Sequence, residues 1–163
     1  MTTTNNATPT GSMSKIPLEH ELRYFPDLRG LPFNFSCYPK VAILQGYLED
    51  GFGTRLRDEE DSQGKHTYLY TRKTGSGISR YEDEHEISEE QFRHEWKNVR
   101  CFLRKDRYFI DWEGVELQLN IFHGDLVQYL QIEVEFKSNE DALAFVAPLW
   151  LGRDVTNDKR HGN

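Results

Sequence analysis

Polar and apolar residues alternate along most of the chain from Ile16 onward, the pattern of β-strands with two unlike faces. Eight segments carry this alternation: 18–25, 41–49, 54–57, 66–71, 78–87, 101–110, 115–122 and 129–136. Eight strands with two helices predict a mainly β fold of the α+β class, a closed eight-stranded antiparallel β-barrel with the helices packed outside. Closure is itself an inference, because the first strand needs a partner late in the chain.

Two segments carry helix signals instead of alternation. Ser88 can cap a helix, and Gln91 stands three residues later in the capping-box position. Ser138 can cap a second helix, since two acidic residues and then an apolar run follow it. Pro148 marks the expected end of that second helix.

The length of 163 residues favours one domain with a core of its own. Residues 1–14 have no hydrophobic period and are expected to be a flexible tail, which leaves 15–163 as the domain. The net charge of -7 argues against broad binding to nucleic acid or to an anionic membrane, and no apolar run reaches the ~20 residues of a spanning helix.

The two cysteines lack the spacing of a zinc site, and no signal peptide precedes them. We interpret them as reduced thiols and expect a cytoplasmic protein, either a monomer or a homodimer.

Charged residues recur at every second position in several of the expected strands, so they share one face of each strand. Glu19, Glu21 and Arg23 do so in the first segment, and Glu133 and Glu135 in the last. The strands between them repeat the pattern at Arg55 and Arg57, at Arg80, Glu82, Glu84 and Glu86, and at Lys105 and Arg107.

An antiparallel sheet with one wet face would explain the charged faces without any ligand. In a closed barrel these faces would instead line the interior, where acids and bases together suit a polyphosphate and a divalent metal such as Mg²⁺ or Mn²⁺. The pattern alone leaves both interpretations open.

Other polar residues are assigned no chemistry. The acidic run 58–61 is interpreted as a solvated loop, His20 as structural, and His161 as solvated. The tryptophans are expected to be packing residues: Trp96, Trp112 and Trp150.

An ordered series of short motifs runs from Pro17 to Asn163. Its members are Glu19-His20-Glu21-Leu22-Arg23, Gln45-Gly46-Tyr47-Leu48, Arg55-Leu56-Arg57, the Lys73 to Glu82 hairpin, Lys105-Asp106-Arg107-Tyr108, Glu133-Val134-Glu135-Phe136 and the tail from Leu151 to Arg160. In this order the motifs resemble the triphosphate tunnel metalloenzymes of the CYTH superfamily, especially the small bacterial inorganic triphosphatases. One E-x-E motif means nothing, whereas the ordered series is specific.

The resemblance implies an eight-stranded tunnel that binds a triphosphate at its centre. The principal metal ion, Mg²⁺ or Mn²⁺, would be bound by Glu19, Glu21, Glu133 and Glu135. Phosphate oxygens would be bound by Arg55, Arg57, Lys73, Lys105 and Arg107, together with Arg80 and Arg23. The expected catalytic residues are Arg23, Lys73 and Glu82, the last of them near a second metal that positions the attacking water.

The implied reaction is hydrolysis of a small-molecule triphosphate, first of all inorganic tripolyphosphate to diphosphate and phosphate, with no covalent intermediate. Class IV adenylate cyclases and thiamine triphosphatases share the tunnel, and the sequence has no clear signature for either.

Three departures from the family pattern bear on turnover. Arg23 stands in place of the usual lysine, and Gln118 and Asn120 stand where the family usually has E-x-D. Because an amide offers a neutral oxygen in place of a carboxylate, the second metal is expected to be weakened. The alternative is therefore a non-catalytic protein that binds a triphosphate, a polyphosphate or a nucleotide.

Overall fold

The computed structural model describes residues 17–161 except 49–52 and 76. The expected tail at 1–14 lies outside the described residues. The strands that the structure describes form one antiparallel sheet: β1 (Leu18–Phe25), β2 (Lys40–Tyr47), β3 (Thr54–Glu60), β4 (His66–Gly75), β5 (Ser79–Glu86), β6 (Cys101–Trp112), β7 (Val115–Phe122), β8 (Leu130–Phe136) and β9 (Arg153–Asp154).

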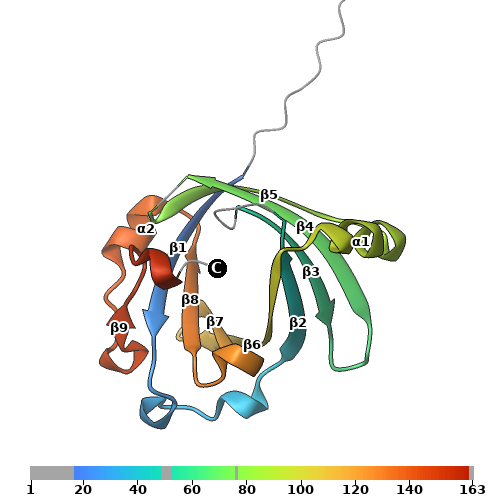
Figure 1. Ribbon diagram of the computed structural model, residues 1–163. Helices are drawn as coiled ribbons and strands as arrows, with labels where there is room; N and C mark the ends of the chain where they lie inside the picture. Colours follow the sequence, from blue (N-terminus) through green and yellow to red (C-terminus); the bar gives the residue numbers. More distant parts are fainter. Residues whose placement is uncertain (1–16, 49–52, 76, 162–163) are drawn as a thin grey trace, which may run out of the picture.

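The sheet closes on itself because β1 pairs with β8 on one edge and with β5 on the other. The order around the ring is β5-β4-β3-β2-β6-β7-β8-β1, which confirms the predicted eight-stranded barrel (Figure 1). In register, Glu19 lies opposite Arg80 of β5, and Glu21 opposite Glu135 of β8. The two-residue β9, which was not predicted, adds to β1 at Tyr24 and Phe25.

Two short α-helices lie outside the barrel, α1 (Glu89–Glu95) beside β4 and α2 (Asn139–Ala144) beside β1 and β8 (Figure 1). The capping box before α1 is present, with reciprocal hydrogen bonds between Ser88 and Gln91. Ser138 caps α2, but the expectation that this helix continues to Pro148 is wrong. The helix ends at Ala144, because Phe145 is already extended and its ring packs against Phe136 and Tyr24.

Single 3₁₀ turns occupy the connections at η1 (Leu28–Gly30), η2 (Phe35–Cys37), η3 (Trp96–Asn98), η4 (Gly124–Leu126), η5 (Leu149–Leu151) and η6 (Lys159–His161). Among the described residues, no helix is both long and apolar enough to cross a membrane. Cys37 and Cys101 are exposed free thiols.

The hydrophobic core lies outside the barrel wall, on the outer faces of β1, β6, β7 and β8. Its buried members are Leu22, Tyr24, Ile110, Leu117, Leu119, Ile132, Val134 and Leu151. Aromatic side chains of the connections cover it, with Phe33 packed between Trp112 and Trp150 at ring-centroid distances of 5.5 and 5.4 Å. With the apolar faces used outside, the alternating charged faces point into the barrel.

Six charged residues of these inward faces are buried: Glu21, Arg23, Arg55, Arg57, Lys105 and Glu133. The structure therefore decides between the two sequence interpretations in favour of the polar interior. It also corrects the expectation of a solvated loop at 58–61, because β3 continues through Glu60 in register with β2 and β4.

Candidate active site

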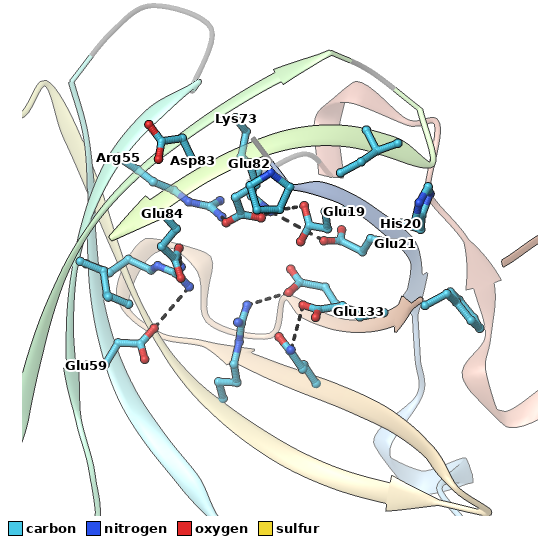
Figure 2. Close-up of a pocket in the computed structure, with 18 of the residues that line it drawn as sticks. Glu19, His20, Glu21, Arg55, Glu59, Lys73, Glu82, Asp83, Glu84 and Glu133 are labelled. Carbon is cyan, nitrogen blue, oxygen red and sulfur yellow. Dashed lines mark hydrogen bonds and ion pairs between the residues drawn. The ribbon is translucent and has the colours of Figure 1, made fainter. Parts of the chain in front are cut away.

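A cavity of about 530 Å³ occupies the barrel, and every barrel strand except β2 contributes side chains to it (Figure 2). Its described lining holds eight carboxylates: Glu19, Glu21, Glu59, Glu82, Asp83, Glu84, Glu133 and Glu135. Four basic side chains face them: Arg55, Arg57, Lys73 and Arg107. The cavity is thus charged with both signs, and acids are in excess.

Three carboxylates gather where β1 meets β8. Oxygens of Glu19, Glu21 and Glu135 all lie within 4.8 Å of one another. This set fits Mg²⁺ or Mn²⁺, because hard cations of this kind prefer carboxylate oxygens. Glu133 was predicted to join them, but its Oε2 accepts a 2.6 Å hydrogen bond from Nη2 of Arg107. The structure therefore brings three of the four predicted metal ligands together.

Two members of this acidic cluster, Glu19 and Glu135, have raised pKa values. Burial raises the pKa of Glu19 to about 8, where Lys73 acts against the shift and Glu21 and Glu82 add to it. Burial likewise raises the pKa of Glu135, with contributions from Glu133 and Glu21. A divalent cation bound by these oxygens would offset the cost of ionising them together, which is a second reason why the residues fit a metal.

Two cations hold the cluster from the β4–β5 side. Lys73 Nζ lies 2.7 Å from Oε2 of Glu19 and 2.8 Å from Oε2 of Glu82. Arg80 Nη2 lies 3.0 Å from Oε2 of Glu21. Lys73 lines the cavity, whereas Arg80, a predicted phosphate ligand, is not among the lining residues.

The pKa values of Glu82 and Glu19 are shifted in opposite directions. Burial disfavours the ionised form of Glu82, but Lys73, the hydrogen bond from Glu19 and Arg55 outweigh it and lower the pKa of Glu82 to about 2. The two carboxyl groups thus form a pair with pKa values pushed apart, an arrangement that can separate acid and base roles. Glu82 therefore faces the cavity as a carboxylate beside Lys73.

The predicted phosphate-binding arginines approach the cavity from β3 and β6. Arg55 Nη2 lies 3.8 Å from Oε1 of Glu82, and Arg107 Nε donates to Oδ1 of Asn120 at 2.9 Å. Nε of Arg55 and Nε of Arg57 are buried and have no hydrogen-bond partner. Buried guanidinium donors without acceptors are costly, and anionic oxygens are the acceptors that suit them best.

Lys105 lies on the same inward face of β6 as Arg107, but it is buried and does not line the cavity. It is 2% exposed, and its Nζ lies 5.5 Å from the ring centroid of Phe122. Burial, followed by the charge of Arg107, lowers the pKa of Lys105 well below its ordinary value. Its predicted contact with phosphate would need the side chain to move from this position into the cavity.

Arg23 connects β1 to the end of the described chain. Its guanidinium donates to the carbonyl oxygens of Thr156 at 2.9 Å and His161 at 3.0 Å, and its Nε lies 3.2 Å from Oε1 of Glu21. Arg23 is not among the cavity-lining residues, so the structure places this predicted catalytic residue behind Glu21.

His161 was interpreted as solvated, and this interpretation is wrong. Its Nδ1 lies 2.7 Å from the hydroxyl of Tyr129, and its carbonyl oxygen accepts from Nε2 of Gln131 at 2.8 Å as well as from Arg23. The stacked ring of Tyr129 shields His161, so the residue is partly buried.

The two amides that replace family acids hold site residues in place. Gln118 Nε2 donates to Oε1 of Glu135 at 2.9 Å, and Asn120 accepts from Arg107. Oε1 of Gln118 and Nδ2 of Asn120 are buried without a hydrogen-bond partner. Gln118 lines the cavity and Asn120 does not, so only one of the departures faces the interior directly.

Two lining carboxylates had been given no role from the sequence: Glu84 was placed on a charged strand face, and Glu59 was assigned to a loop. Arg57 lies between them: its Nη1 is 3.3 Å from Oε1 of Glu59, and its Nη2 forms an ion pair with Glu84. The two-residue spacing from Arg57 to Glu59 was the available signal, and the loop interpretation of 58–61 concealed it.

Comparisons with known proteins agree with this geometry, although no family model matches the chain. One curated relative, the inorganic triphosphatase of Nitrosomonas europaea, is 38% identical over 128 residues, which cover 76% of this chain and 82% of the relative. Another, the inorganic triphosphatase of Acetivibrio thermocellus, is 34% identical over 127 residues, which cover 76% and 78%.

A solved structure, that of the inorganic triphosphatase NE1496, superposes with a TM-score of 0.59 at 28% identity and covers 94% of each chain. The fold, the charged interior and the sequence relatives all indicate the same family. The chain belongs to the triphosphate tunnel metalloenzymes of the CYTH superfamily, in the family of the inorganic triphosphatases.

Proposed function

We propose that the protein hydrolyses inorganic tripolyphosphate to diphosphate and phosphate with the help of Mg²⁺ or Mn²⁺. The observation that carries the proposal is one cavity inside the barrel, with arginines on one side and a three-carboxylate cluster on the other. The relatives named inorganic triphosphatase support this choice of substrate.

The excess of carboxylates explains why metal should be needed. The cavity lining has eight acidic side chains and four basic ones, so it would repel a polyanion that carries no metal, even with one acid protonated. A divalent ion at Glu19, Glu21 and Glu135 would neutralise part of that charge and that of the phosphate oxygens.

The remaining residues position the substrate and the water. Arg55, Arg57 and Arg107 would bind phosphate oxygens, and their fixed charge favours the transfer of a phosphoryl group to water. Glu82, held as a carboxylate by Lys73, can accept a hydrogen bond from the attacking water. Arg23 would act through Glu21 by fixing its carboxylate, and Lys105 would contribute charge from behind Arg107.

The proposal extends to the cellular compartment, the oligomeric state and the ligand class of the enzyme. Exposed free thiols at Cys37 and Cys101 fit a reducing compartment, so we place the protein in the cytoplasm, as a monomer or homodimer. Its ligand is a small molecule, because the charged groups described above converge inside the barrel and the net charge of -7 disfavours nucleic acid.

The test is phosphate release from tripolyphosphate, ATP and thiamine triphosphate, with Mg²⁺ or Mn²⁺ and with chelator. Release that needs metal and is fastest on tripolyphosphate would support the proposal. The double variant Arg55→Ala/Arg57→Ala should lower kcat/KM at least ~100-fold, since two charge-assisted contacts are lost. The control is Arg104→Ala, which removes an exposed arginine of β6.

Metal-dependent binding without turnover would instead favour the non-catalytic alternative, for which the amides at Gln118 and Asn120 are the supporting observation. Faster turnover of ATP or thiamine triphosphate would point to a different substrate of the same tunnel.

A further inference from the structure

Three inward side chains follow one another on β3 at two-residue spacing: Arg55, Arg57 and Glu59. Each step along the strand covers about 7 Å, so the face changes from cationic to anionic over one such step. Glu84 of β5 reaches the same place, because it pairs with Arg57 and accepts a 2.7 Å hydrogen bond from Thr71.

The cations form a row that leads away from the metal cluster. Lys73 touches Glu19 of the cluster and Glu82, and Glu82 in turn lies 3.8 Å from Arg55. Among the described residues, the carboxylate partners of Arg57 are Glu59 and Glu84, neither of which belongs to the cluster. Figure 2 shows these two acids across the cavity from Glu19 and Glu21.

A phosphate chain gripped by metal at the cluster would therefore run along this row and reach Arg57 last. Beyond Arg57 the described lining continues with the carboxylate of Glu59, and the Glu84 carboxylate reaches the same place. The Glu59 and Glu84 side chains are only 19% and 32% exposed, so water screens their charge incompletely.

We propose that Glu59 and Glu84 form an anionic stop that limits the bound phosphate chain at Arg57 and so selects tripolyphosphate against longer linear polyphosphates. The inference rests on the proposed function. Its physical basis is that a further phosphate would bring its oxygens against two carboxylates, and like charges in contact disfavour the wrong partner.

The rival explanation is that Glu59 merely holds Arg57 in position. The two explanations differ in what they predict for substrates of different length. A support for Arg57 affects every phosphate chain that Arg57 binds, whereas a stop affects only chains that extend past it.

The test compares Glu59→Gln with the matched control Glu60→Gln. Both remove one negative charge from the same strand, but Glu60 is exposed and lies out of phase with the inward face. We would measure kcat/KM for tripolyphosphate and tetrapolyphosphate with Mg²⁺ at constant ionic strength, and the dissociation constants of both by calorimetry.

For Glu59→Gln the tetrapolyphosphate-to-tripolyphosphate ratio should rise about tenfold, the effect of relieving one modest like-charge repulsion, and for Glu60→Gln it should stay at the wild-type value. If Glu59→Gln fails to fold cooperatively, Glu84→Gln should shift the ratio in the same direction.

Parallel changes for both substrates, or an equal shift in Glu59→Gln and Glu60→Gln, would overturn the stop and leave tripolyphosphate hydrolysis intact. A wild-type protein that neither binds nor hydrolyses either compound with Mg²⁺ would overturn the proposed function itself, and the stop with it.

Discussion

The acidic residues of the cavity show how strongly one side chain depends on its surroundings. Glu19 and Glu82 share Lys73, yet burial raises the pKa of Glu19 to about 8 while the surrounding cations lower that of Glu82 to about 2. A carboxyl group with a raised folded-state pKa stabilises the fold while it is protonated. Its contribution is full below the ordinary value of 4.5 and is lost as the pH rises through about 8.

We therefore predict that, in chelator, wild-type protein loses unfolding free energy between about pH 5 and pH 8 relative to Glu19→Gln. The glutamine cannot ionise, so the variant should lack this part of the slope, a difference of at least ~1 kcal/mol. Urea unfolding at several pH values measures it, with Glu60→Gln as the control. Identical pH slopes in wild type and Glu19→Gln would contradict the assignment.

At the scale of elements, one glycine decides how the chain returns to β1. Gly152 links η5 to β9 with a φ of 80°, and a Cβ there would lie 2.2 Å from the carbonyl oxygen of Phe25. Gly114, in the β6–β7 turn, has a φ of 83° but no atom within 4 Å of its Cβ position. Both glycines have a positive φ, but only at Gly152 would a Cβ also meet another part of the chain.

Gly152→Ala should lower the unfolding free energy by roughly 2–4 kcal/mol, and Gly114→Ala by about 1 kcal/mol. Both variants place a side chain at a positive φ, and Gly152→Ala adds the close approach of β9 to β1. Denaturant unfolding of both variants gives the comparison, and equal losses would show that the close approach costs nothing.

At the scale of the whole molecule, the barrel concentrates acids from distant strands around one cavity. Metal and triphosphate should therefore join opposite walls of the barrel as well as complete the site. Because they bind the folded chain and not the unfolded one, they stabilise it by mass action.

Mg²⁺ with tripolyphosphate at about 100 times its dissociation constant should stabilise the fold by ~2.7 kcal/mol and raise Tm by roughly 5–10 °C. Chelator should remove the increase, and Glu21→Gln should diminish it, because one carboxylate of the cluster is lost. Differential scanning calorimetry checks this, provided that the scan ends before much of the tripolyphosphate is hydrolysed. Glu60→Gln is expected to respond as the wild type does. A Tm increase that persists in chelator would argue against the metal cluster.

Much of the fold could be predicted because its signals are local. The alternation at 18–25 and 115–122 matches β1 and β7 residue for residue, and Ser88 with Gln91 forms the expected capping box. The end of α2 was misplaced because packing of Phe145, and not Pro148, stops the helix.

The sequence by itself determined which side chains share a face, since strand alternation is a property of the backbone, and its ordered motifs determined the family. Only the tertiary structure decided that those faces turn inward, because the apolar faces found partners outside the barrel. It also decided that Glu133 meets Arg107, that Arg23 meets the carbonyl of His161, and that Glu59 enters the cavity. These contacts join residues far apart in sequence or depend on burial, and a local pattern carries neither kind of information.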